Sequence, residues 1–448
     1  MTSDRAPSSP ALPDLAAAIA VADNDRVALR AHLALRRTDL PLRYWRQQAH
    51  LTTPAADAVI ARKAVESGTA AVTRMLERLG LTGMDLAERL ELPVAVIEAR
   101  LVTPSRAPLV MLDGEDAIAP GEEVAARAMA VAAETFVDAD WGGSEGAVSL
   151  RFYRPPGFNL DTTIRDLYTL LWRLRERMSV VGASIDPAAF PLDGIVFPKV
   201  EHPEEVDLVN DLLDRAETAL GLPAGQIRVA YLIESGWAVA QLPEIARRAA
   251  PRLASLIFGI ADFSADLGLP AIGNEHRLAD WARAEIIAVA GAVGVPAIDG
   301  MTLDYPVADP ALSGAANRTR WLDRMRLVYD DAVRARELGM LGKWVGHPAQ
   351  LFAVLLAYEA ALTDEALEHE ASKLSAYAAA VKADQGATMI AGVMSDRATD
   401  RHARVVLRQA TALGRFDPTR SLALGVISDG EHAEAARAYA AHHGGAGK

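Results

Sequence analysis

The sequence predicts an α/β fold: a (β/α)8 TIM barrel with a helical extension before it and a helical segment after it. Short runs of apolar and β-branched residues alternate along the chain with helical stretches, which is the rhythm of a parallel sheet. Polar residues follow these runs, at the strand ends where the reaction sites of barrels gather. The 448 residues leave room for a barrel and additional segments.

Seven candidate strands carry a clear signal, and an eighth is weaker. The clear ones are apolar runs of the kind that form buried parallel strands, at residues 109–113, 148–152, 194–199, 229–234, 256–259, 296–300 and 343–346. The weaker candidate is 48–53, directly ahead of Pro54. Helical stretches lie between strands, for example at 204–220, 242–250, 281–293 and 321–338. Eight parallel strands would close a barrel.

Composition divides the chain into four regions. Residues 1–14 are polar and rich in Pro and Ser, so we expect disorder there. Residues 15–105 are rich in Ala, Leu and Arg with helical spacing, and this helical N-terminal region can include the first barrel strand. Residues 106–350 form the predicted TIM-barrel catalytic domain. Residues 351–440 form a helical C-terminal appendage that carries Asp396.

The N-terminal region contains a pattern that resembles a helix-turn-helix, at residues 81–90 and 92–97. Such a pair of helices can bind DNA, but the chain is acidic and no basic patch flanks the pair. We therefore expect a helical cap or an oligomer contact at this place.

The totals exclude several classes of protein. The net charge of −13 and the isoelectric point of about 5.3 argue against non-specific nucleic-acid binding and against a basic membrane-binding face. The lack of cysteine excludes disulfides, zinc thiolate sites and thiol nucleophiles. No apolar run reaches the ~18 residues that span a bilayer, and the polar start is unlike a signal peptide. We expect a soluble cytoplasmic protein with no nucleic-acid or membrane partner.

Glu234 and Asp262 are the most informative pair of residues. Each sits just past an apolar run that reads as a buried strand, and packing explains a carboxylate there poorly. Two carboxylates at neighbouring strand ends make an oxygen-rich site suited to Mg²⁺ or Mn²⁺. A 2-oxo acid could complete the coordination through its carboxylate and keto oxygens, and the metal would then act as a Lewis acid. The alternative is a structural pair of acids held by salt bridges.

Further polar residues lie at or just beyond other predicted strand ends, which in a barrel share one rim. Any one of them can be a capped strand end, but a succession of them favours a reaction site. Together with Glu234 and Asp262, they are Asp113, Arg151, Lys199, Asp299 and His347.

These residue types suggest distinct roles. A guanidinium at a strand end, as predicted for Arg151, is a rigid fork for a carboxylate or an enolate oxygen. Arg154 competes for that role, but it starts a Pro-rich loop, so we expect it on the surface. Asp113, Glu115 and Asp116 crowd three acids together, which suits a shell around a metal and its waters; the alternative is a solvated acidic loop.

Lys199 and His347 leave alternatives open. A lysine that ends a barrel strand could form a Schiff base with a carbonyl substrate, although the nearby carboxylates favour a metal-dependent lyase. His347 stands before Pro348, and it could act as a base or anchor a loop through hydrogen bonds.

Taken in order, eight segments resemble the HpcH/HpaI aldolase and citrate lyase β-subunit family, and its CoA-lyase branch with malyl-CoA and citramalyl-CoA lyases in particular. They cover roughly residues 107–410 and read MLDGEDAIAPGEE (111–123), SLRFY (149–153), GIVFPKVEHPEEV (194–206), YLIESGWAV (231–239), LIFGIADFSADLG (256–268), GVPAIDGMTLDYP (294–306), LGKWVGHPAQ (341–350) and AGVMSDRATDRHA (391–403). One departure is Gly114, where the family usually carries an apolar residue.

The resemblance implies a Mg²⁺-dependent TIM barrel that forms a homo-oligomer, usually a trimer or hexamer. Glu234 and Asp262 match the family's metal ligands, and Arg151 matches the arginine that faces the enolate. Gly259 and Ala261, which lead to Asp262, fall in the segment that contacts substrate.

The resemblance adds roles for residues that spacing alone does not assign. Asp113, Glu115 and Asp116 match the acidic motif at the metal, with Glu115 in the catalytic set and Lys199 and His347 around it. Asp396 matches the catalytic acid/base of a C-terminal segment that can reach a neighbouring subunit. From the residues alone, Asp396 reads as an ordinary helix N-cap.

The predicted reaction is cleavage or formation of a 3-hydroxyacyl-CoA, giving an acyl-CoA and a 2-oxo acid by a Claisen-type reaction. One alternative is a class II pyruvate-type aldolase that works without CoA. An alternative of another class is a regulatory or assembly protein that uses its N-terminal helices and has lost turnover.

Overall fold

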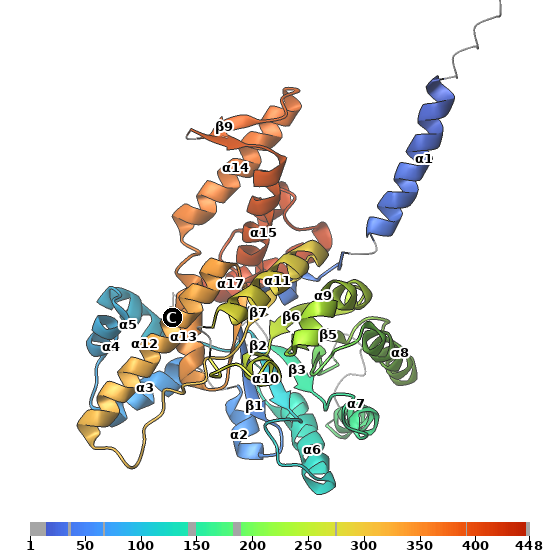
Figure 1. The fold of residues 1–448 in the computed structure, drawn as a ribbon. Helices are drawn as coiled ribbons and strands as arrows, with labels where there is room; N and C mark the ends of the chain where they lie inside the picture. The colour runs from blue at the N-terminus through green and yellow to red at the C-terminus, as the bar shows by residue number, and fades with distance from the viewer. Residues whose placement is uncertain are drawn as a thin grey trace, which may run out of the picture.

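A computed structural model describes residues 15–34, 37–65, 68–141, 149–181, 190–273, 276–390 and 392–444. Its centre is a closed barrel of eight parallel strands in sequence order (Figure 1). The strands are β1 (Ala49–Pro54), β2 (Leu109–Asp113), β3 (Leu150–Arg154), β4 (Gly194–Phe197), β5 (Arg228–Ile233), β6 (Leu253–Phe258), β7 (Ala297–Asp299) and β8 (Gly342–Val345). The predicted fold class is confirmed, and so is the weak eighth strand, which closes the ring between β2 and β8.

Helices surround the barrel and connect each strand to the next (Figure 1). They are α2 (Ala58–Lys63), α6 (Glu122–Asp138), α7 (Thr163–Val180), α8 (Pro203–Leu220), α9 (Gly236–Ala249), α10 (Ile260–Asp266), α11 (Arg277–Val293), α12 (Gly314–Leu338) and α13 (Pro348–Glu359). The helices α9, α11 and α12 begin before the predicted boundaries. Ser235 and Ser313 supply side-chain caps for α9 and α12, which shows why those two start earlier.

The N-terminal region contributes α1 (Leu15–Ala34), the short 3₁₀ helix η1 (Leu42–Arg46), α3 (Gly68–Leu79), α4 (Gly83–Leu90) and α5 (Val94–Val102). The helix-turn-helix-like segment forms α4 and α5, which contact each other, and α5 also contacts α3. A capping box between Thr82 and Asp85 starts α4. Because α3 packs on α13 and α4 packs on α12, this module covers one side of the barrel.

After the barrel the chain forms an arm of two antiparallel helices that stands away from the barrel (Figure 1). The arm consists of α14 (Asp364–Lys382), the hairpin β9 (Thr388–Ile390) and β10 (Val393–Ser395), and the returning helix α15 (Arg397–Ala412). The chain then ends with α16 (Pro418–Ala423) and α17 (Asp429–Gly444). Because α15 packs on η1, directly before β1, the arm is rooted at the N-terminal end of the barrel.

Alternation of side chains along each strand separates the barrel interior from the helix layer. Trp344 and Lys343 are neighbours in β8, yet Trp344 contacts Thr52 and Arg154, whereas Lys343 is paired with Asp331 of α12. None of the helices within the described ranges is long and apolar enough to cross a membrane.

Asp299 ends β7 as predicted, but its side chain is turned toward the helix layer. It is fully buried, 2.6 Å from Arg283 Nε of α11 and 2.7 Å from Lys343 Nζ. Lys343 also lies 2.9 Å from Asp331, whose pKa falls to about 2 because the lysine, Thr302 and Arg334 outweigh its burial. The expectation that Asp299 faces the rim is therefore wrong: Asp299 binds α11 through Arg283, and Lys343 extends the network to Asp331 of α12.

We predict that Asp299→Ala lowers the free energy of unfolding by about 3–5 kcal/mol, because it removes the buried carboxylate that Arg283 and Lys343 share and leaves excess positive charge in the interior. The matched control is Asp330→Ala, which removes an exposed partner of Arg326 on α12 and should cost at most about 1 kcal/mol. Urea unfolding followed by circular dichroism measures both. Equal losses in the two variants would contradict the buried network.

Candidate active site

The strands β2 to β6 place charged side chains at or just past their C-terminal ends, at the mouth of the barrel. Asp113 and Arg154 are the last residues of β2 and β3, and they lie side by side because the two strands pair in register. Glu234 directly follows β5, and Asp262 lies in the first turn of α10 after β6. The sequence-predicted pair Glu234 and Asp262 therefore follows adjacent strands.

Arg154 lies at the centre of the mouth, not on the surface as expected. Its side chain is only 3% exposed. The guanidinium lies 2.5 Å from Glu115 Oε2, 2.7 Å from Asp116 Oδ2 and 3.3 Å from Asp113 Oδ2. Within the described ranges, Arg154 Nε is buried without a hydrogen-bond partner. One donor of this buried fork is therefore left without a partner among these residues.

Arg151 does not lie at the mouth, so its predicted position is wrong. It is the second residue of β3, and its backbone N and its Nε both bond to Asp193 Oδ2, at 2.9 and 3.2 Å. Asp193 directly precedes β4, at the opposite end of the barrel. The sequence places this strand at 148–152, but pairing with β2 extends it to Arg154. That difference of two residues puts Arg154 where Arg151 was expected.

Glu234 is a buried carboxylate, 4% exposed, whose Oε1 accepts a hydrogen bond of 2.7 Å from the backbone N–H of Lys199. Burial raises its pKa to about 8; Arg154 and Lys199 oppose this rise, and Asp262 adds to it. Gly259 lies directly against this carboxylate, because a Cβ there would be 2.8 Å from Glu234 Oε2. Neighbouring Ala261 is half-buried, and the substrate contacts predicted for Gly259 and Ala261 stay predictions.

Lys199 holds the acids of the mouth together. Its Nζ lies 3.0 Å from Asp116, 3.5 Å from Glu115 and 3.7 Å from Asp262. Burial lowers the pKa of Lys199, but Glu234, Glu115 and Asp116 outweigh it and the net shift is upward. A lysine held in the charged form is a poor nucleophile, which disfavours the Schiff-base alternative. Its backbone is left-handed, with φ 51°, a conformation that aims the N–H at Glu234.

The mouth carries more negative than positive charge. Five acids, those of Asp113, Glu115, Asp116, Glu234 and Asp262, surround the cations of Arg154 and Lys199, and the four besides Glu234 already outnumber the two cations. The excess suits a divalent cation, and the oxygen-only set of side chains is the kind that Mg²⁺ binds. Across the described residues, no three His, Asp or Glu side chains are arranged as a ready-made metal site. The geometry instead suits a site in which two carboxylates bind the cation and oxygens of water and substrate complete its coordination.

His347 and Trp344 form another part of the wall. His347 Nδ1 accepts a hydrogen bond of 3.1 Å from the N–H of Ala349 and so caps α13, and burial lowers its pKa. This geometry favours the loop anchor over the base. Trp344 was missed by sequence reasoning: its ring lies 5.8 Å from the Arg154 guanidinium carbon. Its inward position could have been predicted from the alternation of side chains in β8, because Trp344 follows the outward-facing Lys343.

Asp396 is remote from this mouth. It caps α15 as the residues alone predicted, and its Oδ1 accepts bonds of 2.8 and 3.1 Å from Ala398 and Thr399, which lower its pKa. It lies at the hairpin end of the arm, whose root is at the other end of the barrel (Figure 1). The fold therefore does not bring Asp396 to Glu234 and Asp262 of the same chain.

Gly114, the departure from the family pattern, has a local cause. Any Cβ at this position would lie 2.0 Å from the hydroxyl oxygen of Tyr153, so a larger residue does not fit. Glycine lets the loop between Asp113 and Glu115 pass over the end of β3. There the N–H of Gly114 donates a hydrogen bond of 2.9 Å to the carbonyl oxygen of Arg154.

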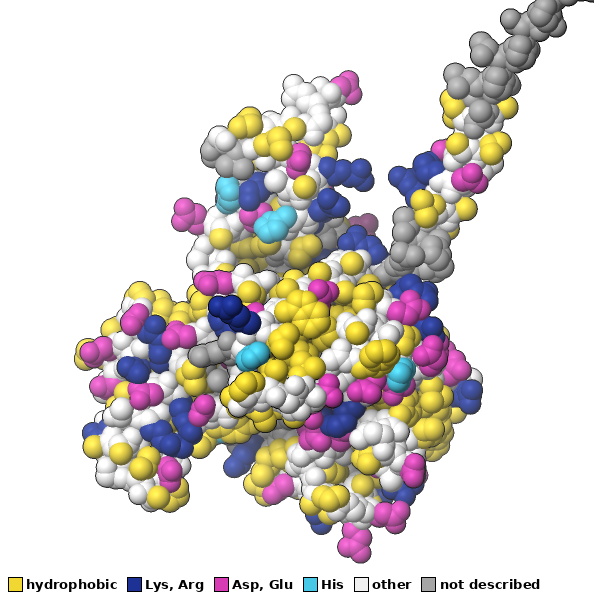
Figure 2. All heavy atoms as spheres, viewed as in Figure 1, with side chains coloured by type: hydrophobic (Ala, Val, Ile, Leu, Met, Phe, Trp, Pro, Cys, Tyr) yellow, Lys and Arg dark blue, Asp and Glu magenta, His cyan; other side chains and the backbone are white. Residues whose placement is uncertain are grey.

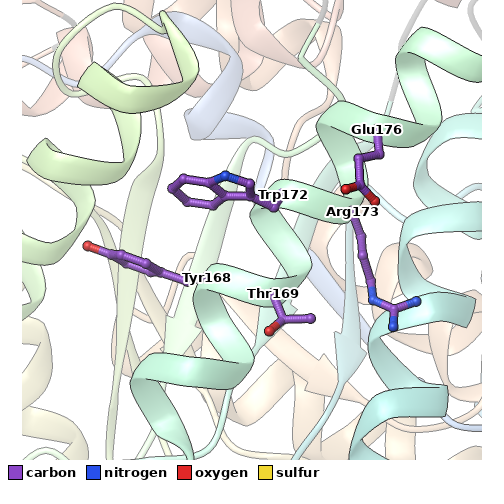
Figure 3. A pocket seen from close by; sticks show the side chains of 5 residues that line it. All are labelled: Tyr168, Thr169, Trp172, Arg173 and Glu176. Carbon is purple, nitrogen blue, oxygen red and sulfur yellow. The ribbon is translucent and has the colours of Figure 1, made fainter.

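A separate hollow lies outside the barrel, on α7 alone (Figure 3). Tyr168 and Trp172 stack there at 5.4 Å, and the Tyr168 hydroxyl donates to Leu212 O of α8. Because β3 and β4 separate this helix from the barrel interior, the hollow is not part of the mouth.

Buried arginine, crowded carboxylates and a closed barrel together define a barrel enzyme with a candidate divalent-metal site at its mouth. Comparison with known proteins identifies the group. A family model described as a domain of unknown function, DUF6986, matches residues 43–431. The L-malyl-CoA/β-methylmalyl-CoA lyases of Cereibacter sphaeroides and Rhodobacter capsulatus are each 30% identical over 323 residues, covering 68% of this chain and 88% of theirs.

A citrate lyase from Burkholderia xenovorans shares the fold, with 22% identity, a TM-score of 0.53, and coverage of 88% of this chain and 96% of its own. The chain belongs to the HpcH/HpaI aldolase and citrate lyase family, in its CoA-lyase branch, and to the DUF6986 group. It is a carbon–carbon lyase.

We predict that Glu234→Gln stabilises the metal-free protein at high pH. Because the folded pKa of about 8 lies above the usual value of 4.5, stability from protonated Glu234 is complete below pH 4.5 and lost as pH rises toward 8. In thermal unfolding with EDTA between pH 5 and 9, the melting temperature of the variant should rise relative to that of the wild type as pH increases. The exposed control Glu244→Gln should show no such gain, and a pH-independent effect of Glu234→Gln would contradict the assignment.

Proposed function

We propose that this lyase uses Mg²⁺ to cleave or form a 3-hydroxyacyl-CoA, with an acyl-CoA and a 2-oxo acid as the other partners. The observation that carries this proposal is the excess of carboxylates around Arg154 and Lys199 at the mouth. The malyl-CoA lyase relatives support the CoA thioester. These relatives also favour a CoA-dependent lyase over the CoA-independent aldolase. The charged side chains at the mouth favour catalysis over a purely regulatory role.

Glu234 and Asp262 would hold the Mg²⁺, which supplies a Lewis acid for the keto oxygen of the 2-oxo acid. The free donor of Arg154 would stabilise the negative oxygen of the enolate, the role expected for Arg151. Asp113, Glu115 and Asp116 would fix the guanidinium, and Lys199 would position Glu234 through its backbone N–H. Mn²⁺ fits the same oxygen ligands.

Asp396 would serve the mouth of a second copy. Two features support a homo-oligomer, for which the family pattern gives a trimer or hexamer. The arm ends in exposed apolar side chains, with Met389 64% and Met394 57% exposed. An apolar patch on and around α10 and α11 is also visible in Figure 2, and its exposed members are Leu267, Ile272, Leu278 and Trp281, with Trp237 at the start of α9. Apolar surfaces of this kind mark contacts between proteins.

We predict that Arg154→Lys lowers kcat/KM for malyl-CoA by at least a hundredfold, because lysine cannot reproduce the buried fork. Arg151→Lys is the matched control, since it changes the same residue type on the same strand but at the opposite end of the barrel. It should keep kcat within a few-fold of wild type. Steady-state assays with Mg²⁺ measure both, and a larger loss in Arg151→Lys would refute the assignment to Arg154.

A second test addresses Asp396. Asp262→Asn and Asp396→Asn should each abolish turnover, while isothermal titration shows Mg²⁺ binding weakened only in Asp262→Asn. Co-expression of the two variants should restore part of the activity, because some mouths with native Asp262 would receive a native Asp396 from another copy. Mixed oligomers without any activity would show that Asp396 does not act across subunits.

A further inference from the structure

A second hollow lies at the N-terminal end of the barrel, opposite the mouth, where the arm is rooted. Its volume is about 790 Å³, in the range of small-molecule sites. Apolar side chains line part of it, among them Leu40, Trp45 and Ile427, and the cations Arg228 and Arg408 line another part. An apolar wall beside guanidinium groups is the lining that suits an organic anion.

Arg228, the first residue of β5, is the cation here whose charge is least compensated. Its Nη1 and Nη2 donate to the backbone carbonyls of Pro251 and Asp39, each at 3.3 Å. No carboxylate in the described part of the chain lies within ion-pair distance of it, and Arg43 and Arg252 add like charge nearby. The acid whose charge acts on Arg228 is Asp39, and because its side chain is exposed, the compensation is weak.

Arg408 connects three segments around the same hollow. It lies on α15 and donates hydrogen bonds to two backbone carbonyl oxygens. One is that of Leu40, which precedes the barrel, at 3.2 Å, and the other is that of Val426, which follows α16, at 3.1 Å. Its charge is compensated by Glu431, with bonds of 2.5 and 3.2 Å. Because Asp396 caps the other end of α15, a molecule seated beside Arg408 contacts the helix that carries Asp396.

We propose that this hollow is a binding site for a small organic anion, with an apolar body against Trp45 and Ile427 and a phosphate or carboxylate group on Arg228. Occupancy would fix the angle between α15 and the barrel and so tune the position of Asp396. This consequence rests on the proposed function, whereas binding itself does not.

Binding can be measured with 8-anilino-1-naphthalenesulfonate, a fluorescent aryl anion, on the full-length protein without substrate. Arg228→Gln should weaken the binding that this site contributes by about tenfold, because a charged hydrogen-bond donor is lost. Asp39→Asn should strengthen it, because an exposed negative charge is removed beside Arg228. The control Arg37→Gln removes an exposed charge close in sequence and should leave binding unchanged.

Competition separates the two sources of the anionic group. Displacement of the dye by adenosine monophosphate indicates a phosphate, and displacement by hexanoate indicates a carboxylate. Either result supports the site, provided that the displacement is lost in Arg228→Gln. Equal dye binding in the wild type, Arg228→Gln and Asp39→Asn would overturn the proposal, and because Asp39 is exposed, its variant tests the site even if Arg228→Gln fails to fold.

Discussion

The ion cluster of Arg154 is the interaction on which the rest of the mouth depends. A buried guanidinium is costly unless carboxylates surround it, and here Asp113, Glu115 and Asp116 do so. The same acids then exceed the positive charge available, which makes the mouth attractive to a divalent cation. One arginine therefore fixes the loop after β2 and creates the electrostatic demand that a metal would meet.

The fold also keeps the carboxylates of the mouth away from Asp396, the candidate acid/base of the same chain. The mouth opens at the C-terminal end of the barrel, whereas the arm with Asp396 is rooted at the N-terminal end. A single copy thus holds the metal-type carboxylates and the candidate acid/base apart. Assembly into an oligomer would join them, and the hollow beside Arg228 lies at the joint where the arm could be adjusted.

Features with a local signal in the sequence are predicted correctly, whereas strand pairing decides the positions that the sequence does not reveal. Glu234 and Asp262 follow continuous apolar strands, so their places at adjacent strand ends were readable. Arg151 and Arg154 are three positions apart, and only the register with β2 shows that Arg154 ends the strand. Asp299 was placed correctly along β7, yet its partners Arg283 and Lys343 come from distant segments and turn it away from the mouth.

The sequence by itself determined the barrel, the order of its strands, the family and the carboxylates that follow β5 and β6, because periodicity, apolar runs and family segments are properties of neighbouring residues. Only the tertiary structure decided which arginine is buried among the acids, which face of a strand meets the helices, and where the arm stands. Those outcomes depend on strand register and on charges brought together from distant segments, and burial makes each such pairing either strongly favourable or strongly unfavourable.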